Sequence, residues 1–339
     1  MHKTRVSVVI PCYNEESYIG NCLSSIFAQD YPLELIQVFV ADGRSTDKTR
    51  AVLSSWNERW ENVHMLDNPE RHTPQALNIG IQASDSHVVI ILGAHAEMFP
   101  DYISNCINVL NDHPEVACVG GVLDHVNENR GAEIIAKAMS SPFGVGNVRF
   151  RTGGQPGYVD TVAFGAYRRE VFNKVGLFDT DLVRNQDDEF NYRILASGDK
   201  IWFDPSIRSK YFVRSSFEKL FKQYRQYGYW KVFVNVKHKT VTTVRQLVPA
   251  IFVFTMVSLI LLGFAFPAFW SVFASALVLW FLVAMGAAMA ARTSSALLGG
   301  VVLAFFILHV SYGLGYLEGI VRFAILRLKP RSSRLETTR

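Results

Sequence analysis

The chain has 339 residues, of which 49% are hydrophobic and 19% charged, and its formal net charge is +4. So apolar a composition excludes an intrinsically disordered chain, and the length allows one α/β domain with a further part. Residues 1–240 carry 26 basic and 28 acidic side chains, whereas residues 241–339 carry 8 basic and 2 acidic ones. The excess positive charge therefore accompanies the apolar C-terminal third, which indicates a membrane surface and not nucleic acid as the partner.

Two features bear on the cellular compartment. The four cysteines, Cys12, Cys22, Cys106 and Cys118, show no C-x-x-C spacing, so we expect reduced thiols in the core of a cytosolic domain. The first five residues lead straight into a strand-like run, so we expect no signal peptide. The N-terminal domain is therefore predicted to lie in the cytoplasm.

The first ninety residues alternate short apolar runs with helical periodicity. Strands are predicted at residues 6–10, 36–40, 63–66 and 87–92, and helices at residues 19–27, 48–56 and 74–83, the last capped by Thr73. Strands and helices that alternate at this spacing imply a parallel sheet with right-handed crossovers. Because ligands bind beyond the carboxyl ends of such strands, this half is predicted to bind a nucleotide.

The second predicted strand ends at Asp42-Gly43. Gly43 permits a close approach of the backbone to a flat ligand. Ser45, Thr46 and Asp47 offer caps to the following helix. The alternative is an Asp-Gly turn before a capped helix, with no part in binding.

Residues 115–204 are less regular than the first segment. They hold predicted strands at 116–122 and 159–166, a glycine-rich stretch at 144–157, a helix that starts at Arg169, and the acidic cluster Asp187-Asp188-Glu189. Loops this long in a compact domain are usually functional or mobile. Acidic residues also stabilise the first turn of a helix, which could account for one or two of the three carboxylates.

The C-terminal third is predicted to enter a membrane. Aromatic and basic residues interleave over residues 217–239, which suits either a helix among lipid headgroups or a basic face packed on the domain. Three runs without acidic or basic residues follow at 248–266, 268–291 and 296–317, each close to the ~20 residues that cross a bilayer. We predict three membrane-embedded helices.

The positions of basic residues raise a question of topology. Three spans would place Arg322, Arg327, Lys329, Arg331 and Arg334 on the side opposite the N-terminal domain, against the positive-inside tendency. Either the tail is an exception, or the first two runs, joined at Pro267 with almost no loop, form a re-entrant pair. The side of the tail stays open.

Two motifs carry a resemblance. Pro11-Cys12-Tyr13-Asn14-Glu15-Glu16 and Ala41-Asp42-Gly43-Arg44-Ser45-Thr46-Asp47-Lys48-Thr49 resemble the start of the family 2 glycosyltransferases, and the resemblance runs over residues 5–230. It is strongest to the branch that makes bacterial exopolysaccharides such as succinoglycan, which shares the glycine-rich loop, an acidic cluster like residues 185–193 and C-terminal spans. The resemblance implies an α/β GT-A fold with a mixed, mainly parallel sheet, followed by transmembrane helices.

The resemblance also implies a donor site. Asp42 would receive the uracil ring of a UDP-sugar, and the residues expected around the nucleotide sugar are Pro11, Tyr13, Glu15, Arg71 and Asn78. Arg71 would face the diphosphate, because a fixed guanidinium stabilises the charge of that leaving group. The alternative for Arg71 is a solvated loop arginine.

Asp187 is implied as the general base. In an inverting transfer one carboxylate takes the proton of the acceptor hydroxyl, and no covalent intermediate is needed. Asp188 and Glu189 would hold structure or acceptor. The family often has Glu before the base, whereas this chain has Gln186, which puts fine acceptor contacts in question.

The largest departure from the family follows the fourth strand. An Asp-x-Asp motif that binds ribose and a divalent metal is expected there, but the chain reads Gly93-Ala94-His95. In an extended segment Gly93, His95 and Glu97 would share one face. His95 with Glu97 would then hold Mn²⁺ better than Mg²⁺, since imidazole suits Mg²⁺ poorly. Alternatively, His95 only contacts substrate or backbone and the metal is lost.

Residues 226–230 loosely resemble the Gln-x-x-Arg-Trp motif of processive synthases, but the arginine and the spacing fail, which disfavours processive synthesis. Trp230 is predicted either to stack on an acceptor sugar or to anchor a helix at the membrane.

These expectations combine into one hypothesis. Residues 1–215 form a GT-A domain, 216–246 an interface helix, 247–320 three membrane-embedded helices and 321–339 a basic tail. The protein would transfer a hexose, glucose by resemblance, from a UDP-sugar to a lipid-linked or oligosaccharide acceptor in exopolysaccharide or cell-surface glycan synthesis. It would be a multi-pass protein of the inner (plasma) membrane, in contact with membrane lipids. The alternative is a membrane-tethered, nucleotide-binding pseudoenzyme.

Overall fold

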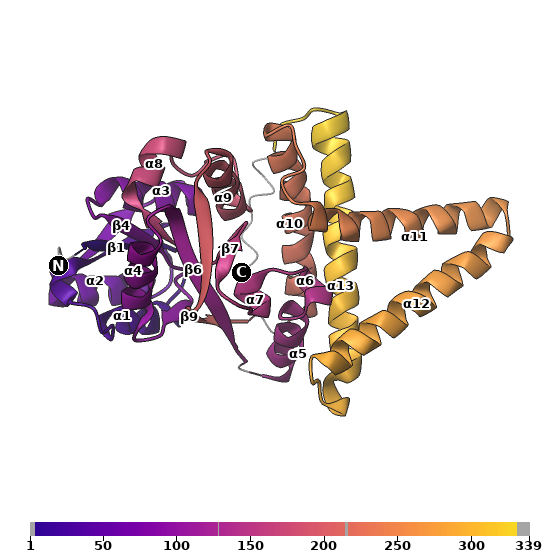
Figure 1. The fold of residues 1–339 in the computed structure, drawn as a ribbon, viewed down its shortest axis with the longest axis horizontal. Coiled ribbons are helices and arrows are strands. Elements are labelled where there is room, and N and C mark those ends of the chain that lie inside the picture. Colours follow the sequence, from indigo (N-terminus) through magenta and orange to yellow (C-terminus); the bar gives the residue numbers. More distant parts are fainter. Residues whose placement is uncertain (1–3, 128, 214–215, 331–339) are drawn as a thin grey trace. The chain divides into compact units, whose positions relative to one another are not determined.

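The computed structural model describes residues 4–127, 129–213 and 216–330 (Figure 1). The chain divides into two compact units: unit 1 comprises residues 1–125 and 149–212, and unit 2 comprises residues 126–148 and 213–339. Residues 126–148, which lie inside the predicted domain 1–215, thus belong to unit 2. The predicted tail at 321–339 is described only to residue 330, so Arg331 and Arg334 lie outside the described residues.

Unit 1 is built on one sheet. Across the described ranges, with their gaps at 128 and 214–215, nine strands take part, in the order β3-β2-β1-β4-β8-β6-β9-β5, with β7 paired to β9. Their bounds are β1 Val6–Cys12, β2 Ile36–Asp42, β3 Val63–Asp67, β4 Val88–Ile91, β5 Ala96–Met98, β6 Val116–Val126, β7 Gly157–Val159, β8 Ala166–Arg168 and β9 Lys200–Phe212.

Parallel and antiparallel pairing divide the sheet. β3, β2, β1 and β4 pair in parallel, whereas β8 is antiparallel to β4 and to β6, and β9 is antiparallel to β5 and to β7. The mixed sheet predicted from the sequence is confirmed. The expected predominance of parallel pairs holds for the N-terminal half, where short β-branched runs alternate with crossover helices.

Helices cover both faces of this sheet. Their bounds are α1 Ile19–Phe27, α2 Thr49–Arg59, α3 Thr73–Ala83, α4 Tyr102–Asp112, α7 Arg149–Thr152, α8 Arg169–Val175 and α9 Gln186–Ala196. Side chains of α1, α2 and α4 pack in one apolar core, and side chains of α3, α8 and α9 pack in a second core with other sheet residues. All four cysteines are buried and free, as the sequence predicts.

Two local predictions in unit 1 are wrong. No strand runs from 159 to 166, because Phe164 has a φ of 50°, which a continuous strand does not accommodate. Pairing therefore stops at Val159 and resumes at Ala166. Thr73 is the first residue of α3 and not its cap, and the preceding His72 makes no side-chain cap bond.

Unit 2 consists of helices. Their bounds are α5 Arg130–Met139, α6 Pro142–Val145, α10 Phe217–Lys237, α11 Leu247–Ala265, α12 Ala268–Ala290 and α13 Ser295–Gly319, with a π-helical turn at Ile320–Ile325. Among the described residues three helices are long and apolar enough to cross a membrane: Val244–Ala265, Ala268–Ala290 and Ser295–Ile325. The three membrane helices predicted from the sequence are therefore present as helices.

Candidate active site

The parallel strands end together. Cys12 of β1 pairs with Asp42 of β2, and Asp42 pairs with Asp67 of β3, so three strand ends form one carboxyl edge. Asp42 is 2% exposed, and its Oδ1 accepts a hydrogen bond of 2.6 Å from the Ser45 hydroxyl. Its Oδ2 lies 3.7 Å from Nε of Arg50. Oδ2 also accepts from the Ser45 N–H at 3.2 Å, so Ser45 orients both carboxylate oxygens.

The loops after β1 and β2 bind each other. The backbone N–H groups of Asn14, Glu15 and Glu16 donate to the side chains of Ser45, Thr49 and Asp47, at 2.8, 2.7 and 3.2 Å. The sequence predicted Ser45, Thr46 and Asp47 as helix caps. Asp47 does accept a bond of 2.9 Å from the Thr49 N–H at the start of α2, whereas Ser45 and Thr46 join the two loops; the N-cap position of α2 is Lys48. The hydrophobic periodicity of a single segment does not reveal a contact between two separate loops.

Tyr13, Gly43 and Arg71 lie together at this edge. A Cβ atom on Gly43 would come within 3.2 Å of the Tyr13 ring, so only glycine lets the ring lie so close to the backbone. The Arg71 guanidinium lies 5.8 Å from the centroid of the same ring. Arg71 itself has a φ of 60°, a strained conformation for a non-glycine residue that is common at functional sites. Pro11 lies within β1, opposite Ala41.

His95 faces Glu15. Its Nδ1 lies 3.5 Å from Oε1 of Glu15, and its ring lies 5.3 Å from that of Tyr211. The predicted extended segment 93–97 is wrong, because Ala94 and His95 form a turn that is closed by a bond from Ala96 N–H to the Gly93 carbonyl. Glu97 instead accepts a bond of 2.9 Å from Lys210. The turn and this ion pair separate Glu97 from the predicted metal position.

The side chains around His95 offer few ligand atoms for a metal ion. In the part of the chain that the structure describes, no group of three or more His, Cys, Asp or Glu side chains could hold one. His95 and Glu15 supply two adjacent ligand atoms, and Gly93 supplies none. These side chains alone do not fit a protein-held metal centre, because divalent ions in such sites take more ligands than two.

Asp187 lies in the first turn of α9. β8 is antiparallel to β4, so the chain enters β8 from the carboxyl edge. Thr161, shortly before β8, accepts a bond of 2.9 Å from Asn191, one turn after Asp187. The first turn of α9 is thereby held near the carboxyl edge. Burial raises the pKa of the neighbouring Tyr167 hydroxyl, with Cys118 and Asp187 adding to the effect.

Glu189 has a structural environment. It is fully buried, and both of its carboxylate oxygens accept bonds from Arg193 at 2.9 to 3.1 Å. Arg193 also donates to the backbone carbonyls of Val175 and Leu177, so the pair joins α9 to the end of α8. Of the two roles predicted for Glu189, the geometry favours structure over acceptor binding. Asp188 is half-buried beside it.

Two predicted contacts are not supported by the geometry. The Asn78 amide donates to the Phe178 carbonyl at 2.8 Å and accepts from the Phe178 N–H at 2.9 Å, so it clasps backbone and does not face a nucleotide sugar. Trp230 of unit 2 is 2% exposed and packs edge-on against Tyr229 and Phe233, which leaves no ring face open to a sugar.

Sequence reasoning missed a cluster around Tyr211. The Tyr211 ring lies between His95 and His125, whose ring centroid is 6.3 Å away. Nη1 of Arg151 lies 3.4 Å from Nε2 of His125. Burial, with the Arg151 charge, lowers the pKa of His125 to about 3, so this imidazole is neutral at physiological pH. The pairing of Ala96 with Tyr211 brings His95 to Tyr211, and the neighbouring strand β6 supplies His125; no local sequence pattern predicts either neighbour.

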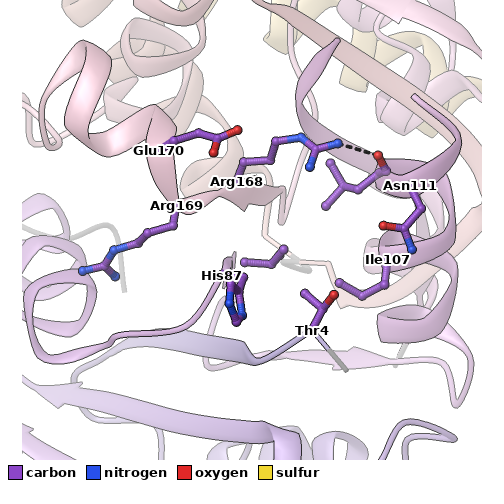
Figure 2. Close-up of a pocket in the computed structure, with 9 residues that line it drawn as sticks. Thr4, His87, Ile107, Asn111, Arg168, Arg169 and Glu170 are labelled. Carbon is purple, nitrogen blue, oxygen red and sulfur yellow. Dashed lines mark hydrogen bonds between the residues drawn. The ribbon is translucent and has the colours of Figure 1, made fainter. Parts of the chain in front are cut away.

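A cavity of about 310 Å³ lies at the opposite edge of the sheet, lined by residues at the amino ends of β1 and β4 (Figure 2). Arg168 lines it but donates to the carbonyls of Val116 and Leu110, and Arg169 donates to Ser84 at 2.5 Å. The cavity is therefore separate from the edge that carries Asp42.

Comparison with known proteins decides the family. The family model described as Glycosyl transferase family 2 matches residues 7–176. A relative from Methanococcus voltae, a dolichyl N-acetyl-α-D-glucosaminyl phosphate 3-β-D-2,3-diacetamido-2,3-dideoxy-β-D-glucuronosyltransferase, is 35% identical over 265 residues, which cover 76% of this chain and 82% of the relative. The chain belongs to glycosyltransferase family 2. The enzyme class predicted from the sequence is thus confirmed.

Other family 2 proteins agree with this membership. The succinoglycan biosynthesis protein ExoA of Rhizobium meliloti is 29% identical over 246 residues, which cover 71% of this chain and 73% of ExoA. The mannosyltransferase PcManGT of Pyrobaculum calidifontis, solved with GDP-mannose and Mn²⁺, superposes with a TM-score of 0.62 at 20% identity over 94% of this chain and 88% of that one. TarS of S. aureus, solved with UDP-GlcNAc, superposes with a TM-score of 0.51 at 17% identity over 66% of this chain and 65% of that one. These likenesses confirm the GT-A fold of this glycosyltransferase.

Proposed function

We propose that this glycosyltransferase transfers a hexose-based sugar from UDP to a lipid-linked saccharide with inversion at the anomeric carbon. The observation that supports the proposal is that Asp42 ends β2 at the carboxyl edge, while α9, which carries Asp187, is bonded through Asn191 to Thr161, shortly before β8 starts from the same edge. The relative from Methanococcus voltae supports the acceptor class, since its name specifies a lipid phosphate-linked sugar. ExoA supports a role in exopolysaccharide or cell-surface glycan synthesis.

We propose a role for each residue of the donor site. Asp42, oriented by Ser45, accepts from the uracil ring, and Pro11, Tyr13 and Glu15 line the nucleoside pocket. Arg71, held beside Tyr13, binds the diphosphate and stabilises the charge that it gains on departure. His95 contacts the donor from the far side of Glu15.

Asp187 acts on the acceptor. Its carboxylate is exposed in the first turn of α9, where an incoming hydroxyl can reach it. It takes the proton of that hydroxyl as the oxygen attacks the anomeric carbon from the face opposite the diphosphate. Because one carboxylate suffices for an inverting transfer, Asp188 and Glu189 need take no part in the chemistry.

The function is tested by a transfer assay. Purified full-length protein in bilayer discs is given a panel of UDP-sugars and a polyprenyl phosphate-linked saccharide. We expect release of UDP and an acceptor one sugar longer, with UDP-glucose compared directly with an N-acetylated UDP-uronic acid. No transfer from any donor, with UDP still bound, would instead support the nucleotide-binding scaffold.

The assay also tests the metal. With two side-chain ligand atoms available, a divalent ion would depend on diphosphate oxygens and water for its other ligands. Because imidazole favours later first-row ions, turnover is expected to be higher with Mn²⁺ than with Mg²⁺ at equal concentration. Full turnover in chelator would contradict this preference and leave His95 as a substrate contact only.

Asp42→Ala is expected to weaken UDP binding. The change removes the carboxylate that Ser45 orients at the end of β2. Loss of a charged hydrogen-bond partner costs about 1.5–3 kcal/mol, which corresponds to a Kd for UDP about 10- to 150-fold higher by calorimetry. Asp85→Ala at the amino edge of the sheet, whose carboxylate is exposed and pairs with Arg5, is the matched control. Equal UDP affinity in the two variants would contradict the role of Asp42.

We further propose that the protein resides in the plasma membrane with unit 1 in the cytoplasm. UDP-sugars are cytoplasmic, and three helices are apolar enough to enter a bilayer.

A further inference from the structure

α13 is covered along one side by other helices of unit 2. At its start, Arg130 of α5 donates to the Ala296 carbonyl at 2.6 Å. At its centre, His309 bonds the Phe143 carbonyl of α6 through Nε2 at 2.7 Å. At its end, a Cβ on Gly315 would lie 1.9 Å from the Arg225 carbonyl of α10, so the two backbones touch. Cover by protein therefore extends from residue 296 to residue 315.

The covering helices are charged. α5 carries Arg130, Glu133 and Lys137, and α10 carries Glu218, Lys219, Lys222, Arg225, Lys231 and Lys237. Charged side chains at hydrocarbon depth are costly. Such neighbours at both ends and the middle of α13 do not suit a helix that crosses hydrocarbon.

Burial separates α13 from the other two apolar helices. In the most apolar 18-residue stretch of each helix, 50% of the residues are buried inside the protein in α13, against 17% in α11 and 11% in α12. Its exposed large side chains form one stripe at helical spacing, which contains Leu303, Phe306, Leu314 and Val321. A helix that is covered on one side and apolar along one stripe on the other matches a position at the membrane surface.

α11 and α12 form a hairpin that is apolar on all sides. In Figure 1 the end of α11 meets the start of α12, and the two helices spread apart toward α13. Pro267 lies in the turn between them. Many of their large apolar side chains are exposed, among them Ile251, Phe254, Leu261, Phe264, Val278, Leu279, Leu282 and Val283. Two contacts fix the hairpin to α13: Trp280, midway along α12, donates to Nδ1 of His309 at 3.1 Å, and a Cβ on Gly313 would lie 2.4 Å from the Pro249 carbonyl near the start of α11.

The turn at the tip of this hairpin suits hydrocarbon. Residues 264–270 contain no polar side chain. The N–H of Phe266 bonds the Leu262 carbonyl at 2.7 Å, that of Phe269 bonds Phe266 at 3.0 Å, and that of Trp270 bonds Pro267 at 3.1 Å. Pro267 has no N–H to satisfy. These three N–H groups are bonded within the chain, which lowers the cost of placing the turn in a bilayer without water.

Basic residues gather at the base of the hairpin and beyond α13. Arg245 precedes α11, Arg292 follows α12, and Arg322, Arg327 and Lys329 follow α13, while Glu318 is paired with Arg225 at 2.8 Å. None lies near Pro267. Cations placed together suit the anionic cytoplasmic leaflet.

We propose that unit 2 binds the membrane from one face only: the α11–α12 hairpin dips into the hydrocarbon with Pro267 at its deepest point, and α13 lies along the membrane surface. The N-terminal domain, the α12–α13 turn and the segment after α13 are then all on the cytoplasmic side. This topology accounts for the basic residues after α13, which three spans would place outside, and it replaces the multi-pass topology predicted from the apolar runs.

The test adds one cysteine at a time to the full-length protein. Sealed vesicles that are right-side-out or inside-out are then treated with a membrane-impermeant maleimide. The four native thiols are buried, so the parent protein gives the background. The variants are Thr240→Cys, Ala268→Cys, Ser294→Cys and Leu328→Cys. We expect positions 240, 294 and 328 to react from the same face, and position 268 to react from neither face until detergent is added.

Two results of the labelling experiment would overturn the proposal. One is reaction of position 328 from the face opposite to position 240, which would mean three spans; the other is reaction of position 268 from either face. A fluorophore attached at position 268 before reconstitution should also be quenched by lipids that carry a nitroxide in mid-chain. A lack of quenching in protein that retains the thermal stability of the parent would equally refute a tip in hydrocarbon.

Discussion

Asp187→Asn is expected to lower the turnover of sugar transfer by about 10²- to 10⁴-fold, because a positioned general base contributes about that factor. The amide keeps the size of the side chain but cannot accept the proton of the acceptor hydroxyl. Binding of UDP should be nearly unchanged, since the proposed donor site lies at the ends of β1, β2 and β3 and does not include α9. Single-turnover assays with calorimetry of UDP separate the two quantities.

The matched control is Asp181→Asn, the same exchange on an exposed carboxylate six residues earlier. It should retain the turnover of the parent. Asp188→Asn tests the adjacent carboxylate and should reduce turnover far less than Asp187→Asn. Near-normal transfer by Asp187→Asn, with a collapse in Asp188→Asn, would move the assignment of the base to Asp188.

Arg193→Met is expected to cause the largest loss of stability. The change leaves the fully buried Glu189 without the guanidinium that binds both of its oxygens, and it releases the carbonyls of Val175 and Leu177. Removing one partner of a buried ion pair costs about 3–5 kcal/mol. For a domain of this size, that corresponds to a fall in Tm of about 6–20 °C.

Lys174→Met is the control for charge and length. It breaks the pair of Lys174 with Asp199, whose side chains are 50% and 26% exposed, on the neighbouring α8. Exposed pairs contribute about 0–1 kcal/mol, so its Tm should stay within about 4 °C of the parent. Equal Tm values for the two variants would show that Glu189 is not stabilised by its arginine and would reopen its proposed alternative, contact with the acceptor.

The structure differs most from the expectations drawn from the sequence around His95. The alternation of side chains placed Gly93, His95 and Glu97 on one face, which requires an extended chain. A turn at Ala94 and His95 breaks that alternation, and Lys210 pairs with Glu97 across 113 residues of sequence. The choice of partner for a carboxylate depends on strand register far along the chain, which residues 93–97 by themselves do not encode.

By itself, the sequence determined the features that depend on neighbouring residues: the order of strands and helices in the first half, the place of Asp42 at a strand end and the three apolar helices. Hydrophobic periodicity and the residues after each strand act locally, so they are readable in order. Only the tertiary structure decided that Asn78 clasps Phe178, that Glu189 pairs within the core, and that residues 126–148 join the helical unit beside α13. Each of these depends on which distant surface packs against a segment, because burial and charge pairing are settled by contacts and not by spacing along the chain.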